Sequence, residues 1–424
     1  MKLTVWILAA TLIGCGDPAN TGGSAAVGGT GGSGGDPSSS GAGGSGGATA
    51  GGGEGGSNLT SLDELLIRLR NDAEGTLIQE SNADGWPVLV AEGYVAVTRD
   101  TSLDSIAGGF NGWALQPLII DDGFRYVVIP DPSADRGYKF SDGDAYVEDV
   151  WSRSYLFDEF GKLSLIHPDG ARLDRFMAIG DAAIEARTVT VLHPAETPTH
   201  VLYVHDGQNL FDPGAFFGGW KLLDTAPAGM LIVGIDNSPA RMDEYTHVAD
   251  VLDGSPIGGE GDAYANFLES EVRPLVATHY GEPPKVGVLG SSLGGLISLH
   301  AGYQNPTAYD FVGSMSGTLG WGSFGPHTGE TMIERYNDSD VFPFVVYLDS
   351  GGDGPCEDTD ADGISDDGEG TDNYCETVQM RDVLAAKGYV FDVSLHHWHE
   401  PGAPHNEAAW AARVFRPLEI FAAL

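Results

Sequence analysis

Residues 285–303 read KVGVLGSSLGGLISLHAGY, and this stretch decides the fold. A short apolar run, Lys285–Leu289, has the composition of a buried strand, and a helix rich in Leu, Ile and Ala follows it. Between the two lies the pattern Gly-x-Ser-x-Gly, centred on Ser292. A sharp turn from a strand into a helix needs small neighbours so that the serine can project from the edge of the sheet. The context predicts an α/β fold with Ser292 as a nucleophile.

The rest of the carboxyl-terminal half agrees with this fold. Short apolar runs alternate with helical segments over some 250 residues, which indicates a largely parallel sheet covered by helices on both faces. The expected strands include 187–192, 201–204, 230–235, 286–289 and 344–348, and the expected helices are 263–278, 293–303 and 377–387.

A serine hydroxyl is a weak nucleophile until a base removes its proton. His405 lies in the loop after the apparent strand 391–398, where the last strand would deliver a histidine to the top of the sheet. Three further histidines compete for the role because they lie nearby, at His396, His397 and His399. Since these lie in the strand or at its end, the position of His405 beyond the strand favours it as the base.

The segment 85–168 has a different pattern, with short strands punctuated by Gly- and Asp-rich turns. It predicts a small β-sandwich domain, after a helical lead-in over 58–84. Within that lead-in, Ser61 and Glu64 form a capping-box pattern before apolar residues, which predicts an amphipathic helix over 61–71. The hydrolase domain is expected over 169–424, with an acidic insertion at 353–375.

The first 57 residues predict export. Residues 1–14 have the features of a signal peptide, which ends in Leu12-Ile13-Gly14 before Cys15 and resembles the bacterial lipobox. Residues 16–57 contain 19 glycines and predict a flexible tether. We therefore expect a lipoprotein that is anchored through Cys15, with the outer membrane as its destination because Gly16 follows the cysteine.

Two further inferences concern the exterior. The other two cysteines, Cys356 and Cys375, predict one disulfide in an exported chain. The net charge of -40, from 61 acidic and 21 basic residues, repels nucleic acid and anionic lipid. The expected contact with a membrane is therefore through the lipid anchor alone.

Five motifs of the carboxyl-terminal half resemble the putative-esterase family of α/β-hydrolases, which includes enterochelin esterases, feruloyl esterases, esterase D-type enzymes and mycolyltransferases. The motifs are residues 205–212 (HDGQNLFD), 233–237 (VGIDN), Arg241 with Glu244 and Tyr245, 290–295 (GSSLGG), and 405–407 (HNE) before Trp410. The resemblance implies a Ser-Asp-His triad, no catalytic metal, and an oxyanion hole made by the backbone amides of Leu293 and Gln208. Residues 109–113, 138–140 and 146–149 are similar to the early-set immunoglobulin-like modules that precede enterochelin esterases.

The triad acid is less well determined, because the loop after the strand 344–348 is unusually long. Asp353 lies beside the strand end, and Asp372 lies where the chain enters the next helix. A buried carboxylate must orient the imidazole and stabilise its cation. Asp353 is slightly preferred over Asp372, and Asp349 is a third choice.

The same loop contains the ligand spacing of an EF-hand-type calcium site, Asp-x-Asp-x-Asp-Gly followed by five residues and a Glu. The expected ligands are Asp358, Asp360, Asp362, the carbonyl of Ile364, Asp366 and Glu369. The flanking helices of an EF-hand are missing, so the pattern is closer to the free-standing calcium loops of thrombospondin-type repeats. Any calcium would be structural, and none is expected in the chemistry.

The sequence thus predicts a secreted esterase that forms an acyl-enzyme on Ser292 and acts on an ester-containing small molecule or a polysaccharide-linked ester. One alternative is an acyltransferase with the same triad. Another is a non-catalytic, calcium-dependent glycan-binding lipoprotein, although the presence of both Ser292 and His405 argues against it.

Overall fold

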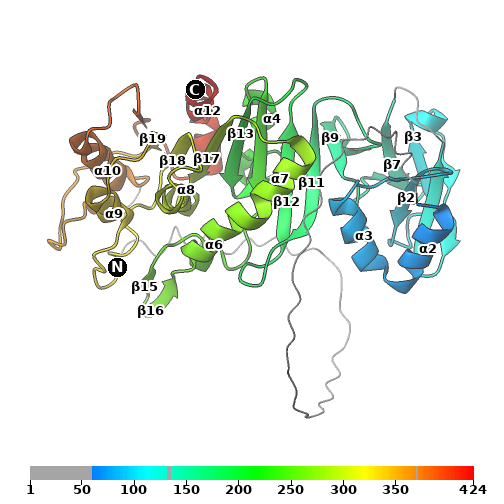
Figure 1. Ribbon diagram of the computed structural model, residues 1–424, viewed down its shortest axis with the longest axis horizontal. Coiled ribbons are helices and arrows are strands. Elements are labelled where there is room, and N and C mark those ends of the chain that lie inside the picture. Colours follow the sequence, from blue (N-terminus) through cyan, green and yellow to red (C-terminus); the bar gives the residue numbers. More distant parts are fainter. Residues whose placement is uncertain (1–59, 131–134, 369–370) are drawn as a thin grey trace, which may run out of the picture.

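The computed structural model describes residues 60–130, 135–368 and 371–424. The expected signal peptide, the lipidated Cys15, the tether and the calcium ligand Glu369 lie outside these ranges. Within them, no helix combines the length and the apolar character that crossing a membrane requires. The described chain is elongated, with one long twisted sheet along most of its length (Figure 1).

Two helices begin the described chain, α2 (Leu62–Asn71) and α3 (Ala73–Asn82). Ser61 and Glu64 form the expected capping box at the start of α2, since each side chain bonds the backbone N–H of the other. The apolar side of α2 packs on a four-stranded antiparallel sheet. Its strands, in spatial order, are β1 (Val88–Val90), β2 (Gly93–Thr98), β6 (Phe124–Ile129) and β5 (Ile119–Asp121).

The long sheet is parallel at one end and antiparallel at the other. Its parallel strands, in spatial order, are β20 (Leu395–His399), β19 (Val345–Ser350), β18 (Phe311–Met315), β17 (Lys285–Ser291), β13 (His200–His205) and β14 (Met230–Ile235). The antiparallel strands follow: β12 (Arg187–His193), β11 (Arg172–Ile179), β9 (Ser154–Asp158), β10 (Gly161–Leu165), β7 (Gly137–Ser141), β3 (Ser105–Gly108) and β4 (Gln116–Pro117). The short strand β8 (Tyr146–Val147) pairs with β7.

The long sheet runs through the position of the expected domain boundary at 168/169. The segment 85–168 does contain two facing sheets, because side chains of β2 and β6 share a core with side chains of β3 and β7. However, β9 pairs with β11 through Leu173–Tyr155 and Asp174–Ser154, so one of the two sheets extends into the hydrolase part. The turn composition of 85–168 predicted the strands but carried no information about which other strands they would meet.

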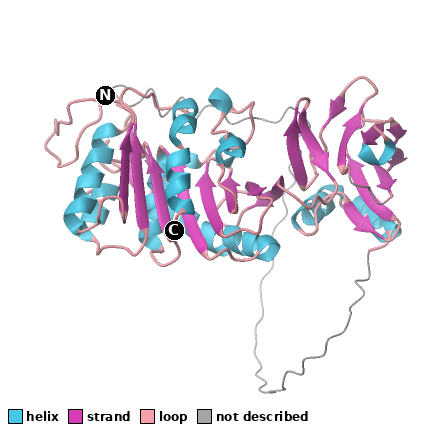
Figure 2. Cartoon of the chain, turned by 90° about the horizontal axis from the view of Figure 1, so that it is seen from above, coloured by secondary structure: helices cyan, strands magenta, loops and turns pink. Residues whose placement is uncertain are grey.

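Helices cover both faces of the parallel strands (Figure 2). One face carries α6 (Gly261–Phe267), α7 (Arg273–Tyr280), α8 (Leu293–Gln304), α9 (Met332–Asp338) and α10 (Tyr374–Lys387). A π-helical turn, Leu268–Val272, joins α6 to α7, where a single helix was expected. The other face is covered by α11 (Glu407–Arg413) and α12 (Phe415–Ala422). The helices form one apolar core on each face of the sheet. The carboxyl ends of the parallel strands β17, β18 and β19 lie together at one edge of this sheet.

Candidate active site

Ser292 lies at the strained turn between β17 and α8. Its backbone angles are φ 57° and ψ -126°, a conformation that residues other than glycine rarely adopt. A Cβ atom on Gly290 would overlap the backbone of Gly294, so the turn requires glycine there. The Ser292 N–H donates to the carbonyl of Met315 (2.9 Å), which fixes the turn to the end of β18. The observed backbone therefore has the sharp strand-to-helix turn that the sequence pattern predicts, and we call this turn the nucleophile elbow.

Two backbone amides flank this turn. Leu293 is the first residue of α8, and Gln208 lies in a single 3-10 turn (Gly207–Asn209) directly after β13. In the part of the chain that the structure describes, neither amide N–H donates to a protein acceptor. An N–H at a helix start that lacks an internal partner can bind an oxyanion.

The loop that carries Gln208 is held by a buried ion pair. Asp206 adopts a left-handed conformation (φ 60°), and Arg241 binds its carboxylate through two hydrogen bonds of 2.7 and 2.8 Å. Asn237 donates a third at 2.6 Å. Burial opposes ionisation of Asp206, but Arg241 and Asn237 together hold the pKa of its carboxyl below the usual value. The charged pair thus keeps the loop in one conformation.

His405 follows β20, as expected, and its Nδ1 lies 2.6 Å from Oδ1 of Asp372. The edge of its ring contacts Trp410, with the two ring centroids 5.0 Å apart. Since Nδ1 is bonded to the carboxylate, Nε2 is the nitrogen that remains for proton transfer.

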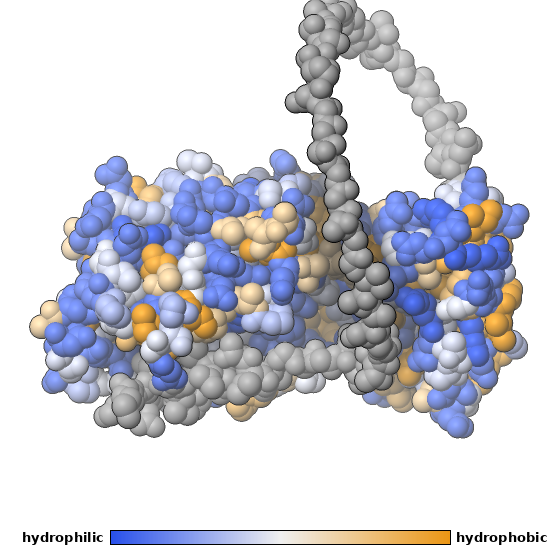
Figure 3. Space-filling view, turned by 90° about the horizontal axis from the view of Figure 1, so that it is seen from below, coloured by the Kyte–Doolittle hydropathy of each residue, from blue (hydrophilic) through white to orange (hydrophobic). Residues whose placement is uncertain are grey.

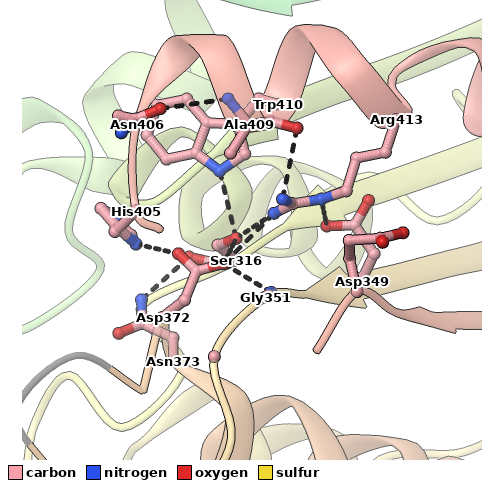
Figure 4. A network of polar contacts seen from close by, with 12 residues as sticks. Ser316, Asp349, Gly351, Asp372, Asn373, His405, Asn406, Ala409, Trp410 and Arg413 are labelled. Carbon is pink, nitrogen blue, oxygen red and sulfur yellow. Dashed lines mark hydrogen bonds and ion pairs between the residues drawn. The ribbon is translucent and has the colours of Figure 1, made fainter. Parts of the chain in front are cut away.

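The Asp372 side chain is fully buried, and its carboxylate lies between His405 and Ser316, below α11 in Figure 4. Its second oxygen, Oδ2, accepts hydrogen bonds from the backbone of Gly351 and from the hydroxyl of Ser316 (2.8 Å). Burial raises the pKa of this carboxyl, but the hydrogen bond and charge of His405, together with Arg413 and Ser316, more than offset that effect and lower it. Asp372 is therefore ionised at neutral pH.

The other two candidate acids lie elsewhere. The Asp353 side chain is 66% exposed and its nearest imidazole is that of His399, at 3.7 Å, so the preference for Asp353 does not agree with the geometry. Asp349 is buried and pairs with Arg413 (2.9 Å), and burial raises the pKa of its carboxyl. The structure brings Asp372, the second choice, to His405.

The other histidines considered for the site, His205, His396, His397 and His399, have local contacts of their own. His396 and His397 lie within β20, where burial lowers their pKa values, that of His397 to about 4. His399 bonds the carbonyl of Gly352. His205 is buried, its Nδ1 lies 3.1 Å from the hydroxyl of Tyr264, and burial lowers its pKa to about 3. A neutral, enclosed imidazole of this kind supports the neighbouring loop.

The acidic insertion is closed by the predicted disulfide between Cys356 and Cys375. Carboxylate oxygens of Asp358, Asp360 and Asp366 lie within 4.8 Å of one another, and all three residues are exposed. Asp362 bonds the backbone of Ile364, whose side chain is buried in the main core. The insertion thus combines a disulfide, a buried anchor and a carboxylate cluster.

Sequence reasoning missed two residues, Ser316 and Arg413. Arg413 lies three residues after Trp410 on the same side of α11, and both side chains donate to the Ser316 hydroxyl. No motif marks either residue, and the only available signal was the helical spacing from Trp410 to Arg413.

The family model described as "Putative esterase" matches residues 182–417. An uncharacterized protein of Bacillus subtilis, YbbA, is 32% identical over 128 residues, which cover 28% of this chain and 49% of that protein. A siderophore triacetylfusarinine C esterase of Aspergillus fumigatus is 32% identical over 72 residues, or 16% of this chain and 25% of the relative. The chain thus spans half or less of these two relatives.

Among solved structures, an IroE-like serine hydrolase from Shewanella oneidensis superposes with a TM-score of 0.46 at 19% identity, over 59% of this chain and 80% of the other. The enterobactin esterase FES from Shigella flexneri gives 0.43 at 14% identity, over 78% and 93%.

Proposed function

The chain belongs to the putative esterase family, and from this premise we propose that it is a serine hydrolase of carboxylic esters in which Ser292, His405 and Asp372 act as the triad. The amides of Leu293 and Gln208 would bind the oxyanion. The family match covers the segment that contains all five residues. The finer assignment of roles rests on the geometry of the site.

One observation carries the proposal: His405 bonds a buried, ionised carboxylate at the same sheet edge as the strained Ser292. The link is short, because Ser292 bonds the carbonyl of Met315 and the next residue, Ser316, bonds Asp372. A strained serine turn and an imidazole oriented by an acid, at the same edge of one sheet, are the parts that acyl transfer needs.

The proposed reaction has two steps. Oγ of Ser292 attacks the ester carbonyl while Nε2 of His405 takes the hydroxyl proton, and the same proton then leaves with the alcohol. Water hydrolyses the acyl-enzyme by the reverse sequence, and the carboxylic acid departs. Asp372 stays ionised and stabilises the imidazolium. The free N–H groups of Leu293 and Gln208 stabilise the tetrahedral oxyanion.

Hydrolysis of p-nitrophenyl acetate and butyrate by the purified protein tests this directly. We expect turnover by the wild type, and a loss of roughly 10³-fold or more in kcat for Ser292→Ala and for His405→Ala. Folding of both variants is checked by thermal melting. An inert wild type, or variants as active as it, would contradict the proposal and favour the glycan-binding alternative.

For the natural substrate we propose an ester-containing small molecule or a polysaccharide-linked ester. The name of the Aspergillus fumigatus relative makes siderophore esters the first compounds to assay, followed by feruloyl and acetyl esters of plant polysaccharide. Product analysis with added alcohols separates hydrolysis from acyl transfer, because a transferase would release a new ester.

We propose a structural calcium site in the acidic insertion. Asp358, Asp360 and Asp366 already converge, and a divalent cation would relieve their mutual repulsion. Calcium is expected to raise the melting temperature of the wild type, and to have no such effect on Asp358→Asn/Asp360→Asn. Equal shifts in both proteins would place the ion elsewhere.

For location we propose an exported lipoprotein that is held at the outer membrane through Cys15. Labelling of cells with a fatty-acid probe is expected to mark the wild type but not Cys15→Ala. Label on both, or on neither, would contradict the anchor.

A further inference from the structure

Asp372 lies on an insertion and not at the end of a strand, so its position must be fixed by side-chain contacts. The carboxylate divides its two oxygens between two tasks. Oδ1 is hydrogen-bonded to His405, while Oδ2 accepts hydrogen bonds from the Gly351 backbone and from the side chains of Ser316 and Arg413 (Figure 4). The contacts at Oδ2 therefore determine where Oδ1 points.

The Ser316 hydroxyl has a defined direction because of its donors. Trp410 Nε1 (3.1 Å) and the Arg413 guanidinium both donate to Ser316 Oγ. Neither donor can accept a hydrogen bond, so the one hydroxyl proton of Ser316 is left for Oδ2 of Asp372. Arg413 thus acts on Asp372 directly, at 3.3 Å, and again through Ser316.

Arg413 also balances the local charge. Its side chain is 2% exposed, and it contacts two carboxylates whose side chains are fully buried, Asp349 and Asp372. The Asp349 carboxylate accepts a hydrogen bond from Nε of Arg413 (2.9 Å) and another from the hydroxyl of Tyr347. Two buried carboxylates without a cation would repel each other strongly. Asp349 is therefore the counter-charge that holds the guanidinium in place.

We propose that Arg413 is a positioning residue of the active site, which orients Asp372 toward His405 through Ser316 and keeps it charged, with Asp349 as its structural partner. This inference rests on the proposed triad. Arg413 touches neither a substrate nor the reacting atoms, so its effect passes through the hydrogen bond between Asp372 and His405.

The test compares two proteins that differ only at position 413. Asp349→Asn leaves Arg413 in place, and Asp349→Asn/Arg413→Met removes the guanidinium without leaving Asp349 as an unpaired charge. We expect kcat for p-nitrophenyl butyrate to be roughly 10- to 100-fold lower in the double variant, with KM unchanged. Asp349→Asn/Arg413→Lys, which restores the charge, should recover part of that loss. Arg416→Met is the matched control, because Arg416 stacks on Trp398 and is not among the hydrogen-bond or ion-pair partners of Asp372 in the described chain; its kcat should match the wild type.

A second readout does not depend on turnover. The proton in a short hydrogen bond between His405 Nδ1 and Asp372 is strongly deshielded, and its proton NMR signal is assigned by its loss in His405→Gln. We expect this signal in Asp349→Asn, and its loss or upfield shift in the double variant, while both proteins melt cooperatively.

The outcomes separate the two proposals. If the double variant retains both the kcat and the NMR signal of Asp349→Asn, Arg413 does not position the acid. If the wild type hydrolyses no ester, the proposed function fails, and the NMR comparison alone decides whether Arg413 orients Asp372.

Discussion

The two aspartates that the sequence could not separate lie in very different surroundings. Asp372 is buried against His405, whereas Asp353 is largely exposed. We expect Asp372→Asn to lower kcat by roughly 10³- to 10⁴-fold, because an amide cannot stabilise the imidazolium. Asp353→Asn is the matched control and should stay within a factor of two to three of the wild type. Steady-state kinetics on p-nitrophenyl butyrate checks both, and a larger loss in Asp353→Asn would reverse the assignment.

Asp149 gives a pH dependence of stability. Burial raises the pKa of its carboxyl to about 6 despite hydrogen bonds from Tyr138 and the Trp151 backbone. In the unfolded chain an aspartate has a pKa of about 3.9. Between these values the folded protein holds a proton that the unfolded chain has released, so the free energy of unfolding falls as pH rises from about 4 to 6.

We expect the free energy of unfolding to fall more in the wild type than in Asp149→Asn. A shift of two pKa units corresponds to a difference between the two proteins on the order of 3 kcal/mol. Urea unfolding at pH 4, 5 and 6.5 measures it. Parallel curves for the two proteins would show that Asp149 does not titrate in this range.

Among the single residues of the site, those that lie in a local sequence pattern could be predicted. Ser292 is found by its glycine neighbours and His405 by its place after the last strand. Asp372 could not be chosen over Asp353, because the path of a long insertion depends on contacts with Gly351 and Ser316. For Arg413 the spacing from Trp410 was the one signal, and it did not reveal the partners Ser316, Asp349 and Asp372, which come from distant parts of the chain.

Among the elements, the elbow between β17 and α8 depends on close backbone packing. A Cβ at Gly290 would overlap the carbonyl of Gly294. We expect Gly290→Ala to lower both the melting temperature and kcat, the latter by at least roughly 100-fold, because Ser292 and the Leu293 amide move together. Gly170→Ala is the control, since its Cβ meets no atom within 4 Å. An active, stable Gly290→Ala protein would contradict the close fit.

The disulfide joins the acidic insertion to the start of α10, three residues after Asp372. Closing a loop of this length stabilises a protein by about 3 kcal/mol in the chain-entropy model. We expect Cys356→Ser/Cys375→Ser to unfold at lower urea concentration and to lose kcat, because the insertion that carries Asp372 becomes less ordered. A loss of stability without any change in kcat would show that other contacts hold Asp372.

At the scale of the whole molecule, the long sheet predicts cooperative unfolding. Besides the pairing of β9 with β11, Arg153 donates to the carbonyl of Ser81, and Asn82 exchanges two hydrogen bonds with Met177. We expect calorimetry of the full chain to show a single transition. Removal of residues 60–168 should expose the edge of β11 and cause aggregation. Two separated transitions would show independent domains.

The strands of both halves were predictable from composition, because apolar runs and turn residues are local signals. Their joining into one sheet was not, because β9 and β11 meet through only two residue pairs. The resemblance to a separate amino-terminal module favoured a boundary where the structure has continuous hydrogen bonding.

Arg153, Arg187, Arg241 and Arg413 are buried, and each bonds acceptors inside the protein. Carboxylates are buried with them, among them Asp206, Glu244 and Asp349, so the excess of negative charge behind the net -40 lies at the exterior, and the face in Figure 3 is largely hydrophilic. The negative potential at such a surface attracts protons, which lowers the local pH, and it makes copies of the protein repel one another in dilute buffer. Added salt screens the repulsion between the acidic side chains. The protein should therefore gain stability at ionic strengths that weaken proteins held together by surface ion pairs.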